Sequence, residues 1–383
     1  KKEARRKLGY LREKGYLYFL PEPDDIRKKK VIPTEKLAAE REELLEKGHA
    51  FSTQTDSEVL VHGFEEWGEG LLTRLRGMFA FAIWNTQDHS LFLARDYFGI
   101  KPMHYCLLPD GRLLWASEIK CLFKHPDFVK EFNEKALDGY LSFQYSVPRE
   151  TFFKNVYCLR PAHYLWYREG KVEEQRYWEA AFHPDEEMTL EQAVDEIDRA
   201  FTDSVEAHRI SDVEVGCFLS SGVDSSFVAS YFGGQKAFTV GFDNGGHYNE
   251  STYAAELAEE VGIDHYTHII GEEEYWGSLE KVQYHLDQPL ADPSCIALYF
   301  VSKLAAEHVK VVLSGEGADE LFGGYRIYHE PYSLAKYQKL PRWLRRGAAA
   351  FVSHLPDFKG KSSLIRGSKR LEERFIGNAY MFG

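Results

Sequence analysis

The sequence has few cysteines and no long hydrophobic run. Its five cysteines, in 383 residues, are widely spaced and include no C-x-x-C pair, so neither a disulfide framework nor a zinc ribbon is indicated. The longest unbroken apolar stretches, such as Met78–Trp84, are as short as a strand, whereas a membrane helix needs about 18 residues. No apolar segment follows Lys1 and Lys2, so the chain as given shows no secretory signal. These features predict a cytoplasmic protein without a membrane segment.

Negative charge predominates, but it is unevenly placed. The net charge is −13, yet residues 1–30 carry 11 Lys and Arg against 5 Asp and Glu, and residues 333–374 carry 11 against 3. Residues 31–332 therefore hold 25 basic against 52 acidic side chains, which argues against a nucleic-acid-binding platform. The two basic ends are typical of solvated surface, and attraction of a polyanionic ligand by the second is the alternative.

Short strands and tight turns dominate residues 57–177. Three pairs of apolar runs flank turn residues: 78–84 with 91–93, 105–108 with 113–115, and 163–167 with 172–177. Such pairs predict antiparallel hairpins. Helices are expected over 57–67 and around 41–47, so the first domain is predicted to be α+β.

After Pro184 the pattern changes to alternating helices and strands. Leu190, Val194, Ile197, Phe201 and Val205 predict an amphipathic helix, and Thr189 with Gln192 has the spacing of a capping box. Strands are expected at 213–219, 238–242, 265–270 and 309–313. Helices are expected at 226–232 and 250–261, with two more before the last strand. This order predicts an α/β domain with a doubly wound parallel sheet. We place the domains at residues 1–182 and 183–383.

The segment from Leu219 to Ser226, LSSGVDSS, lies between a predicted buried strand and a helix. Its small residues, its hydroxyl groups and the amides of the helix N-terminus suit a phosphate. Asp224 would repel a bare phosphate, so a divalent cation that bridges the two is expected. The segment lacks the Gly-Lys-Ser/Thr of a Walker A loop. A strand-to-helix connection without a ligand is the alternative.

A second loop, LSGEGADELFGGY from Leu313 to Tyr325, also follows a predicted strand directly. Glu316, Asp319 and Glu320 place three acids within five residues, and their repulsion calls for a metal ion or a cationic group. A solvated turn is the other interpretation. A third segment, Asp287–Ser294, predicts a loop followed by a helix that Ser294 caps.

The loops from Ser220 and from Ser314, each after a strand and in this order, resemble the pyrophosphatase-type and acidic loops of the asparagine synthetase family. Upstream, GMFAFAIW from Gly77, RDYFGIKP from Arg95 and SEIK from Ser117 resemble the glutaminase domain of that family. Roughly residues 40–383 are covered. The resemblance implies an Ntn-hydrolase-like glutaminase domain followed by an ATP-pyrophosphatase domain.

The resemblance also implies a reaction and a set of residues. ATP would activate the aspartate β-carboxylate as an adenylate, and ammonia from glutamine or from solution would then give asparagine. The implied cofactors are ATP and Mg²⁺. Carried over by position, the implied site residues fall into five groups: Ser220, Gly222, Asp224 and Ser225 for pyrophosphate and magnesium; Phe218, Val240, Ser314 and Gly315 for ATP; Glu316 for the proton or the incoming ammonia; Asp319 as second magnesium ligand; and Asp56 for the glutamine α-amino group.

Two departures keep alternatives open. Glutaminases of this family begin with a cysteine nucleophile, whereas this chain begins with Lys1, and it stops at Gly383 before an expected lysine. Either further residues belong to the protein or the glutaminase site has been lost. The alternatives are a related adenylating synthetase of the β-lactam- or peptide-cyclising type with another acceptor, or an inactive homologue that acts as a binding subunit. A homodimer is compatible with the resemblance, although the sequence gives no direct signal of it.

Overall fold

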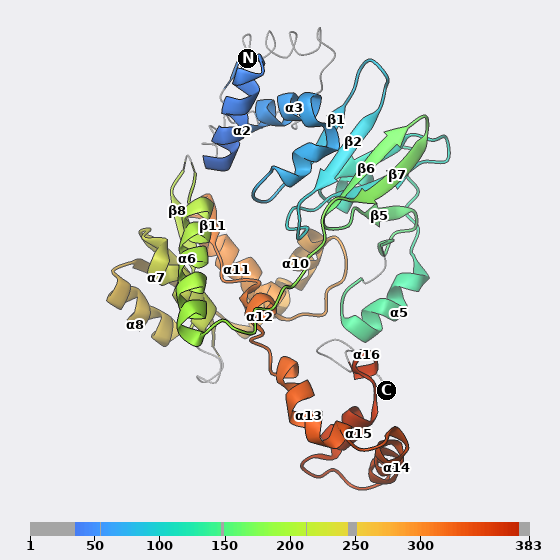
Figure 1. Ribbon diagram of the computed structural model, residues 1–383, viewed down its shortest axis with the longest axis vertical. Coiled ribbons are helices and arrows are strands. Elements are labelled where there is room, and N and C mark those ends of the chain that lie inside the picture. The colour runs from blue at the N-terminus through green and yellow to red at the C-terminus, as the bar shows by residue number, and fades with distance from the viewer. Residues whose placement is uncertain (1–34, 54, 147–148, 212, 244–250, 375–383) are drawn as a thin grey trace.

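The computed structural model describes residues 35–53, 55–146, 149–211, 213–243 and 251–374. It shows two antiparallel sheets in the first half of the chain and a parallel sheet in the second half, so the predicted order of an α+β part and an α/β part is confirmed (Figure 1). The basic residues 1–30 lie outside the described residues.

The first half contains short helices around two antiparallel sheets. One sheet has the strand order β1-β2-β6-β7 and the other has the order β4-β3-β5. The elements are α2 (Glu35–Glu46), α3 (Asp56–Trp67), η1 (Gly68–Thr73), β1 (Ala80–Trp84), β2 (Leu91–Arg95), β3 (His104–Leu107), β4 (Leu113–Ala116), α4 (Ile119–Leu122), α5 (Glu134–Phe143), β5 (Val156–Cys158), β6 (His163–Arg168) and β7 (Lys171–Arg176).

Strand β2 is buried on both of its faces. Successive side chains of a strand point to opposite sides. Phe92 and Ala94 therefore pack in one core with residues of η1, and Leu91 and Leu93 pack in another core with Tyr105 of the other sheet. This explains why residues 91–94 form a continuous apolar run. The helices and the two sheets therefore form stacked layers.

The three predicted hairpins are confirmed. β1 pairs with β2, β3 with β4, and β6 with β7, each in antiparallel register. The helix expected from residue 57 is α3, and the one expected around residue 41 begins earlier, at Glu35.

The second half alternates helices with parallel strands. Its elements are α6 (Leu190–His208), β8 (Val215–Phe218), α7 (Val223–Phe232), β9 (Lys236–Phe242), α8 (Ser251–Val261), β10 (Asp264–Ile270), α9 (Glu272–Gly277), α10 (Leu279–Leu286), α11 (Ser294–Ala306), β11 (Val311–Leu313), α12 (Ala318–Phe322), η2 (Arg326–His329), α13 (Glu330–Gln338), α14 (Arg342–Ser353), α15 (Lys361–Ser368) and α16 (Leu371–Arg374).

The parallel sheet has the strand order β10-β9-β8-β11, with helices on both faces. Ala237 of β9 packs with α7 and α8 on one side, and its neighbour Phe238 packs with α11 on the other. The chain runs outward from β8 to β10 and then returns to β11 on the other side of β8. The sheet therefore reverses its strand order between β8 and β11, where doubly wound sheets bind ligands at the carboxyl ends of their strands.

Helix α6 begins with the predicted capping box. The Thr189 hydroxyl accepts from the Gln192 amide at 3.2 Å, and the Gln192 side chain accepts from the Thr189 amide at 2.9 Å. Only the C-terminal part of the predicted apolar stripe packs into the core: Val205 is buried there, whereas Leu190 and Val194 are exposed.

Two local predictions were wrong. The structure has three helices, α9, α10 and α11, where we expected two, because the chain breaks at Gly277 and Ser278. Ser294 does not cap α11 but is its first residue, and the Asp292 carboxylate accepts from the Ser294 amide at 2.9 Å.

The C-terminal helices α13 to α15 lie beyond the parallel sheet, at the lower end of the view in Figure 1. The prediction that the basic residues here form solvated surface was wrong for Arg374, which is 4% exposed. Its Nη1 lies 3.6 Å from Glu330 Oε2, and Arg366 pairs with the same carboxylate. Part of the positive charge therefore holds helices together. None of the described helices is both long and apolar enough to cross a membrane.

Candidate functional site

The loop after β8 is organised by its serine hydroxyls. The Oγ atoms of Ser220 and Ser225 are 2.8 Å apart, and the Ser225 Oγ also accepts from the Ser220 amide at 3.1 Å. The Gly222 amide donates to Ser220 Oγ at 3.1 Å, and Ser226 Oγ donates to the Gly222 carbonyl at 2.7 Å. These bonds fold residues 220–226 into a compact turn at the N-terminus of α7, where backbone amides favour an anion.

The loop after β11 leads into the five-residue helix α12. Gly317 precedes that helix with φ of +91°, a left-handed conformation that glycine adopts readily. The Glu316 amide donates to Ser314 Oγ at 3.3 Å, and the Glu316 side chain is exposed. Asp319, in the first turn of α12, is half-buried. The loop thus carries acidic groups on a short, tightly turned segment.

The two loops touch at Gly315. A Cβ atom on Gly315 would lie 2.9 Å from both the carbonyl carbon of Asp224 and the amide nitrogen of Ser225, closer than real Cβ contacts allow. Only glycine therefore fits at this position without a shift of backbone. The tertiary structure brings together two segments that the sequence separates by about ninety residues, next to the strand-order reversal between β8 and β11.

Phe218 and Val240 flank this junction on adjacent strands. Both are half-buried and pack against the core on the α11 side of the sheet, which includes Phe238 and Val301. Phe218 is the last residue of β8 and pairs in register with Phe238. Both side chains are held by this core and remain partly open to solvent.

Acidic residues dominate the electrostatics around α12. The Tyr325 hydroxyl donates to Glu320 Oε1 at 2.9 Å. This hydrogen bond, burial, and the negative charges of Glu320, Asp319 and Glu316 raise the pKa of Tyr325 to about 12. The three carboxylates on this short segment would attract a cation.

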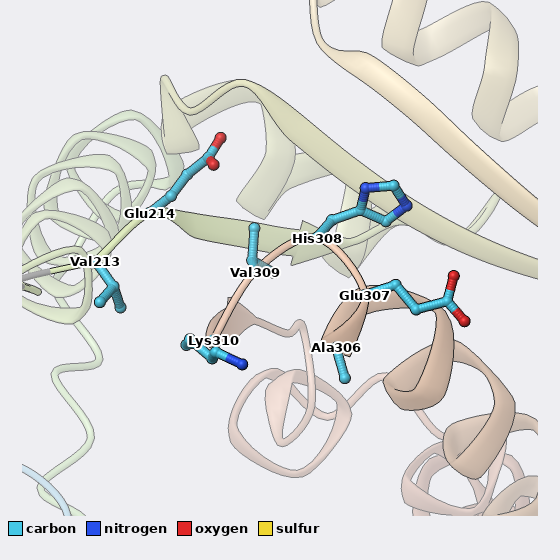
Figure 2. Close-up of a pocket in the computed structure, with 7 residues that line it drawn as sticks. All are labelled: Val213, Glu214, Ala306, Glu307, His308, Val309 and Lys310. Atoms are coloured by element: carbon cyan, nitrogen blue, oxygen red, sulfur yellow. The ribbon is translucent and has the colours of Figure 1, made fainter. Parts of the chain in front are cut away.

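A separate pocket lies at the opposite end of the parallel sheet (Figure 2). Its volume is about 260 Å³, and residues at the start of β8 and in the connection from α11 to β11 line it. Val213 and Glu214 precede β8, and Lys310 precedes β11, so the pocket is at the amino ends of these strands. The loops from Ser220 and Ser314 follow the carboxyl ends, and the pocket is therefore not part of their site.

Asp56, the predicted glutamine contact, is the first residue of α3 in the other half of the chain. Its Oδ1 accepts from the Ser57 amide at 2.7 Å. Glu58 holds the loop before Asp56, because its carboxylate accepts from the Ser52 and Thr53 amides, each at 2.6 Å. The sequence did not indicate this role of Glu58. Burial opposes ionisation of Glu58, but the nearby His62 ring and hydrogen bonds from Ser52 and Thr53 lower its pKa to about 2.

The segment Asp287–Asp292 connects the two halves, which the sequence did not reveal. Asp287 Oδ2 accepts from the Ile119 amide at 2.5 Å, and Gln288 Oε1 accepts from the Phe152 amide at 3.1 Å. The Ala291 amide donates to the Gln144 carbonyl at 2.9 Å. No local signal marks these residues as contacts, because their partners are more than a hundred residues away.

Comparison with known proteins assigns both halves. A glutamine amidotransferase domain model matches residues 37–178, and an asparagine synthase model matches residues 196–376. The first match covers the antiparallel sheets and Asp56. The second covers the parallel sheet and the loops from Ser220 and Ser314.

Individual relatives agree with these two domain matches. The chain is 42% identical to glutamine-hydrolyzing asparagine synthetase 1 of Bacillus subtilis (strain 168), over 89% of this chain and 54% of that protein. It is 40% identical to a putative glutamine-hydrolyzing asparagine synthetase of Mycobacterium tuberculosis (strain ATCC 25618 / H37Rv), over 88% and 53%. It is 30% identical to the amidase chyE of Penicillium rubens (strain ATCC 28089 / DSM 1075 / NRRL 1951 / Wisconsin 54-1255), over 79% and 48%. The chain spans about half the length of these relatives. It belongs to the asparagine synthetase family, with a glutamine amidotransferase domain followed by an asparagine synthase domain.

Proposed function

We propose that the protein converts aspartate to asparagine with ATP, using glutamine or free ammonia as nitrogen donor. The contact of Gly315 with the backbone of Asp224 and Ser225 carries this proposal, because it joins an anion-binding turn to an acidic loop. An oxygen of the aspartate β-carboxylate attacks the α-phosphorus of ATP, and pyrophosphate leaves to give β-aspartyl-AMP. Ammonia then attacks the acyl carbon, and AMP leaves. The names of the relatives support this reaction.

The proposed ATP site follows the two loops. The compact turn after β8 supplies hydroxyl and amide groups to the leaving pyrophosphate. The half-buried side chains on β8 and β9 contact the adenosine, and the start of the second loop continues that surface. In full, the proposed ATP-binding residues are Phe218, Ser220, Gly222, Ser225, Val240, Ser314 and Gly315.

Magnesium fits the donor groups of this site. Carboxylate oxygens are ligands that Mg²⁺ prefers, and Asp224 and Asp319 are half-buried carboxylates on the two loops that Gly315 joins. We assign these two residues to the metal. When bound, magnesium neutralises charge on the polyphosphate and so favours loss of pyrophosphate.

Glu316 is assigned to proton transfer. Its side chain is exposed between two glycines, so a substrate can approach it closely. After ammonia attacks the acyl carbon, the nitrogen carries an extra proton, and we assign its removal to the Glu316 carboxylate.

The first domain, which we place at residues 1–182, is assigned to glutamine. Asp56 binds the glutamine α-amino group as a carboxylate facing a cation. The second domain, residues 183–383, contains the synthetase site. A cytoplasmic location and a homodimer stay predictions.

A synthetase with another acceptor is the second candidate. The 30% identity to the amidase chyE favours it, because a relative with a different name retains this arrangement over 79% of the chain. The adenylating residues are the same in both proposals, and only the amino-acid acceptor differs.

Aspartate-dependent release of pyrophosphate tests the proposal. Full-length protein with ATP, Mg²⁺, aspartate and ammonium should release pyrophosphate and form asparagine. Asp224→Asn should lower the rate by roughly 100-fold or more, the scale of lost metal or electrostatic stabilisation. Glu307→Gln, an exposed acid at the opposite end of the sheet, is the matched control and should keep the rate. Wild-type release by Asp224→Asn would contradict the site, and release with other acceptors alone would favour the second candidate.

A further inference from the structure

Two histidine rings meet beside the loop that leads to α3. His49 follows α2 and His62 lies on α3, and their Nδ1 atoms are 3.2 Å apart. Each side chain is only 13% exposed. The Phe51 ring packs edge-on against His62, with centroids 4.7 Å apart. The two nitrogens therefore lie in a largely enclosed place next to an aromatic ring.

A carboxylate oxygen completes a triangle with these nitrogens. Glu65 Oε2 lies 3.7 Å from Nδ1 of His49 and 3.7 Å from Nδ1 of His62. In a triangle with sides of 3.2, 3.7 and 3.7 Å, the point equidistant from the corners is about 2 Å from each, which matches Zn–N and Zn–O bonds in proteins. Glu65 is 38% exposed, so a water molecule can reach a fourth position.

The second nitrogen of each ring faces another carboxylate. Nε2 of His49 is 3.4 Å from Glu66 Oε2, and Nε2 of His62 is 3.8 Å from Glu58 Oε1. Histidines that bind metals usually present their second nitrogen to a carboxylate, which fixes the tautomer and leaves the first nitrogen free to bind the metal. Glu66 is itself held by Lys47, whose Nζ is 2.7 Å from Oε1.

We propose that His49, His62 and Glu65 bind a divalent transition-metal ion, with zinc as the best fit and water as the fourth ligand. Imidazole and carboxylate ligands together suit zinc, whereas Mg²⁺ prefers six oxygen ligands. The three nearby carboxylates, Glu58, Glu65 and Glu66, provide compensating negative charge. The ion would tie the segment after α2 to α3. This site is separate from the ATP loops and does not depend on the proposed function.

The alternative is a direct hydrogen bond between the two rings, in which one Nδ1 donates to the other. That arrangement needs no ion and predicts no saturable binding of zinc at this place. The two cases therefore differ in a property that a titration measures.

Zinc titration of the full chain, first freed of metal by a chelator, tests the proposal. Calorimetry in competition with a chromophoric chelator should show one zinc ion per chain at these residues, and Co²⁺ should give the absorption bands of a tetrahedral site. His49→Gln and His62→Gln should each weaken binding by more than the roughly 10- to 100-fold that loss of a supporting carboxylate costs. Glu66→Gln should weaken zinc binding by a factor within that range.

His208→Gln, a change of an exposed histidine at the end of α6, is the matched control and should bind zinc as the wild type does. Glu65→Gln, at a partly exposed position, provides a variant that keeps its fold if the histidine variants do not, and it should also weaken binding. Two results would overturn the proposal. One is absence of zinc binding by the wild type, and the other is zinc affinity equal to that of the wild type in Glu65→Gln and the histidine variants.

Discussion

Lys120 and Asp287 join the two domains through an ion pair, with Lys120 Nζ 2.7 Å from Asp287 Oδ1. The residues are 167 positions apart in the sequence. Their side chains are only 15% and 9% exposed. Burial opposes protonation of Lys120, but hydrogen bonds to Asp287 and Glu118 raise its pKa. Asp287 also has φ of +61°, which non-glycine residues rarely adopt, so these contacts hold a strained residue in place.

Lys120→Met should therefore destabilise the protein. The change leaves the Asp287 carboxylate largely buried without its cation, and breaking such a pair on one side costs about 3 kcal/mol. Thermal melting should show a lower midpoint, and hydrogen exchange should be faster at the Ile119 amide, which donates to Asp287. Lys124→Met, at an exposed lysine just after α4, is the control. Equal melting of the two variants would show that the pair contributes nothing to stability.

Glu316→Gln should separate nucleotide binding from amide formation. The Glu316 side chain is exposed and its amide donates to Ser314 Oγ, so the change removes a charge without disturbing that bond. We expect ATP affinity, measured by calorimetry, to stay within a few fold. Asparagine formation should fall by roughly 100-fold, the usual contribution of a positioned acid or base. Loss of ATP binding would instead assign Glu316 to the metal or to the structure of the loop.

Cys217 should resist alkylation in the folded protein. It is fully buried, and burial raises the pKa of its thiol to about 12. Burial also raises the thiol pKa of Cys106 and Cys158. The thiolate is the reacting form, so iodoacetamide at pH 8 should leave these three residues unmodified, as read by mass spectrometry. The exposed Cys121 is the internal reference, and urea should make all of them reactive. Rapid modification of Cys217 without denaturant would contradict its burial.

The sequence predicted features that depend on neighbouring residues. The capping box of Thr189 and Gln192 formed as expected, because both partners lie within one helical turn. The hairpins followed from paired apolar runs around turn residues. The prediction that Ser294 caps α11 was wrong, because Asp292 and Ser294 both suit a helix start and only the backbone path distinguishes them.

The two loops were predicted from the sequence because each directly follows a strand. The individual site residues within them were predicted from the family resemblance. Their contact through Gly315 depends on β11 lying next to β8, which sequence periodicity does not specify. The His49 and His62 pair was also missed. Its residues are close in sequence, yet the spacing of thirteen places them together only when α2 and α3 pack.

The amino-acid sequence by itself determined the order of helices and strands, the change from antiparallel to parallel organisation, and the position of the two loops directly after strands. These properties depend on side-chain periodicity, turn chemistry and charge, which act over a few residues. The tertiary structure alone decided that Gly315 meets Asp224, that Asp287 meets Lys120, and that His62 meets His49. Such contacts depend on strand order and helix packing, because only the folded chain brings the positions of distant residues together.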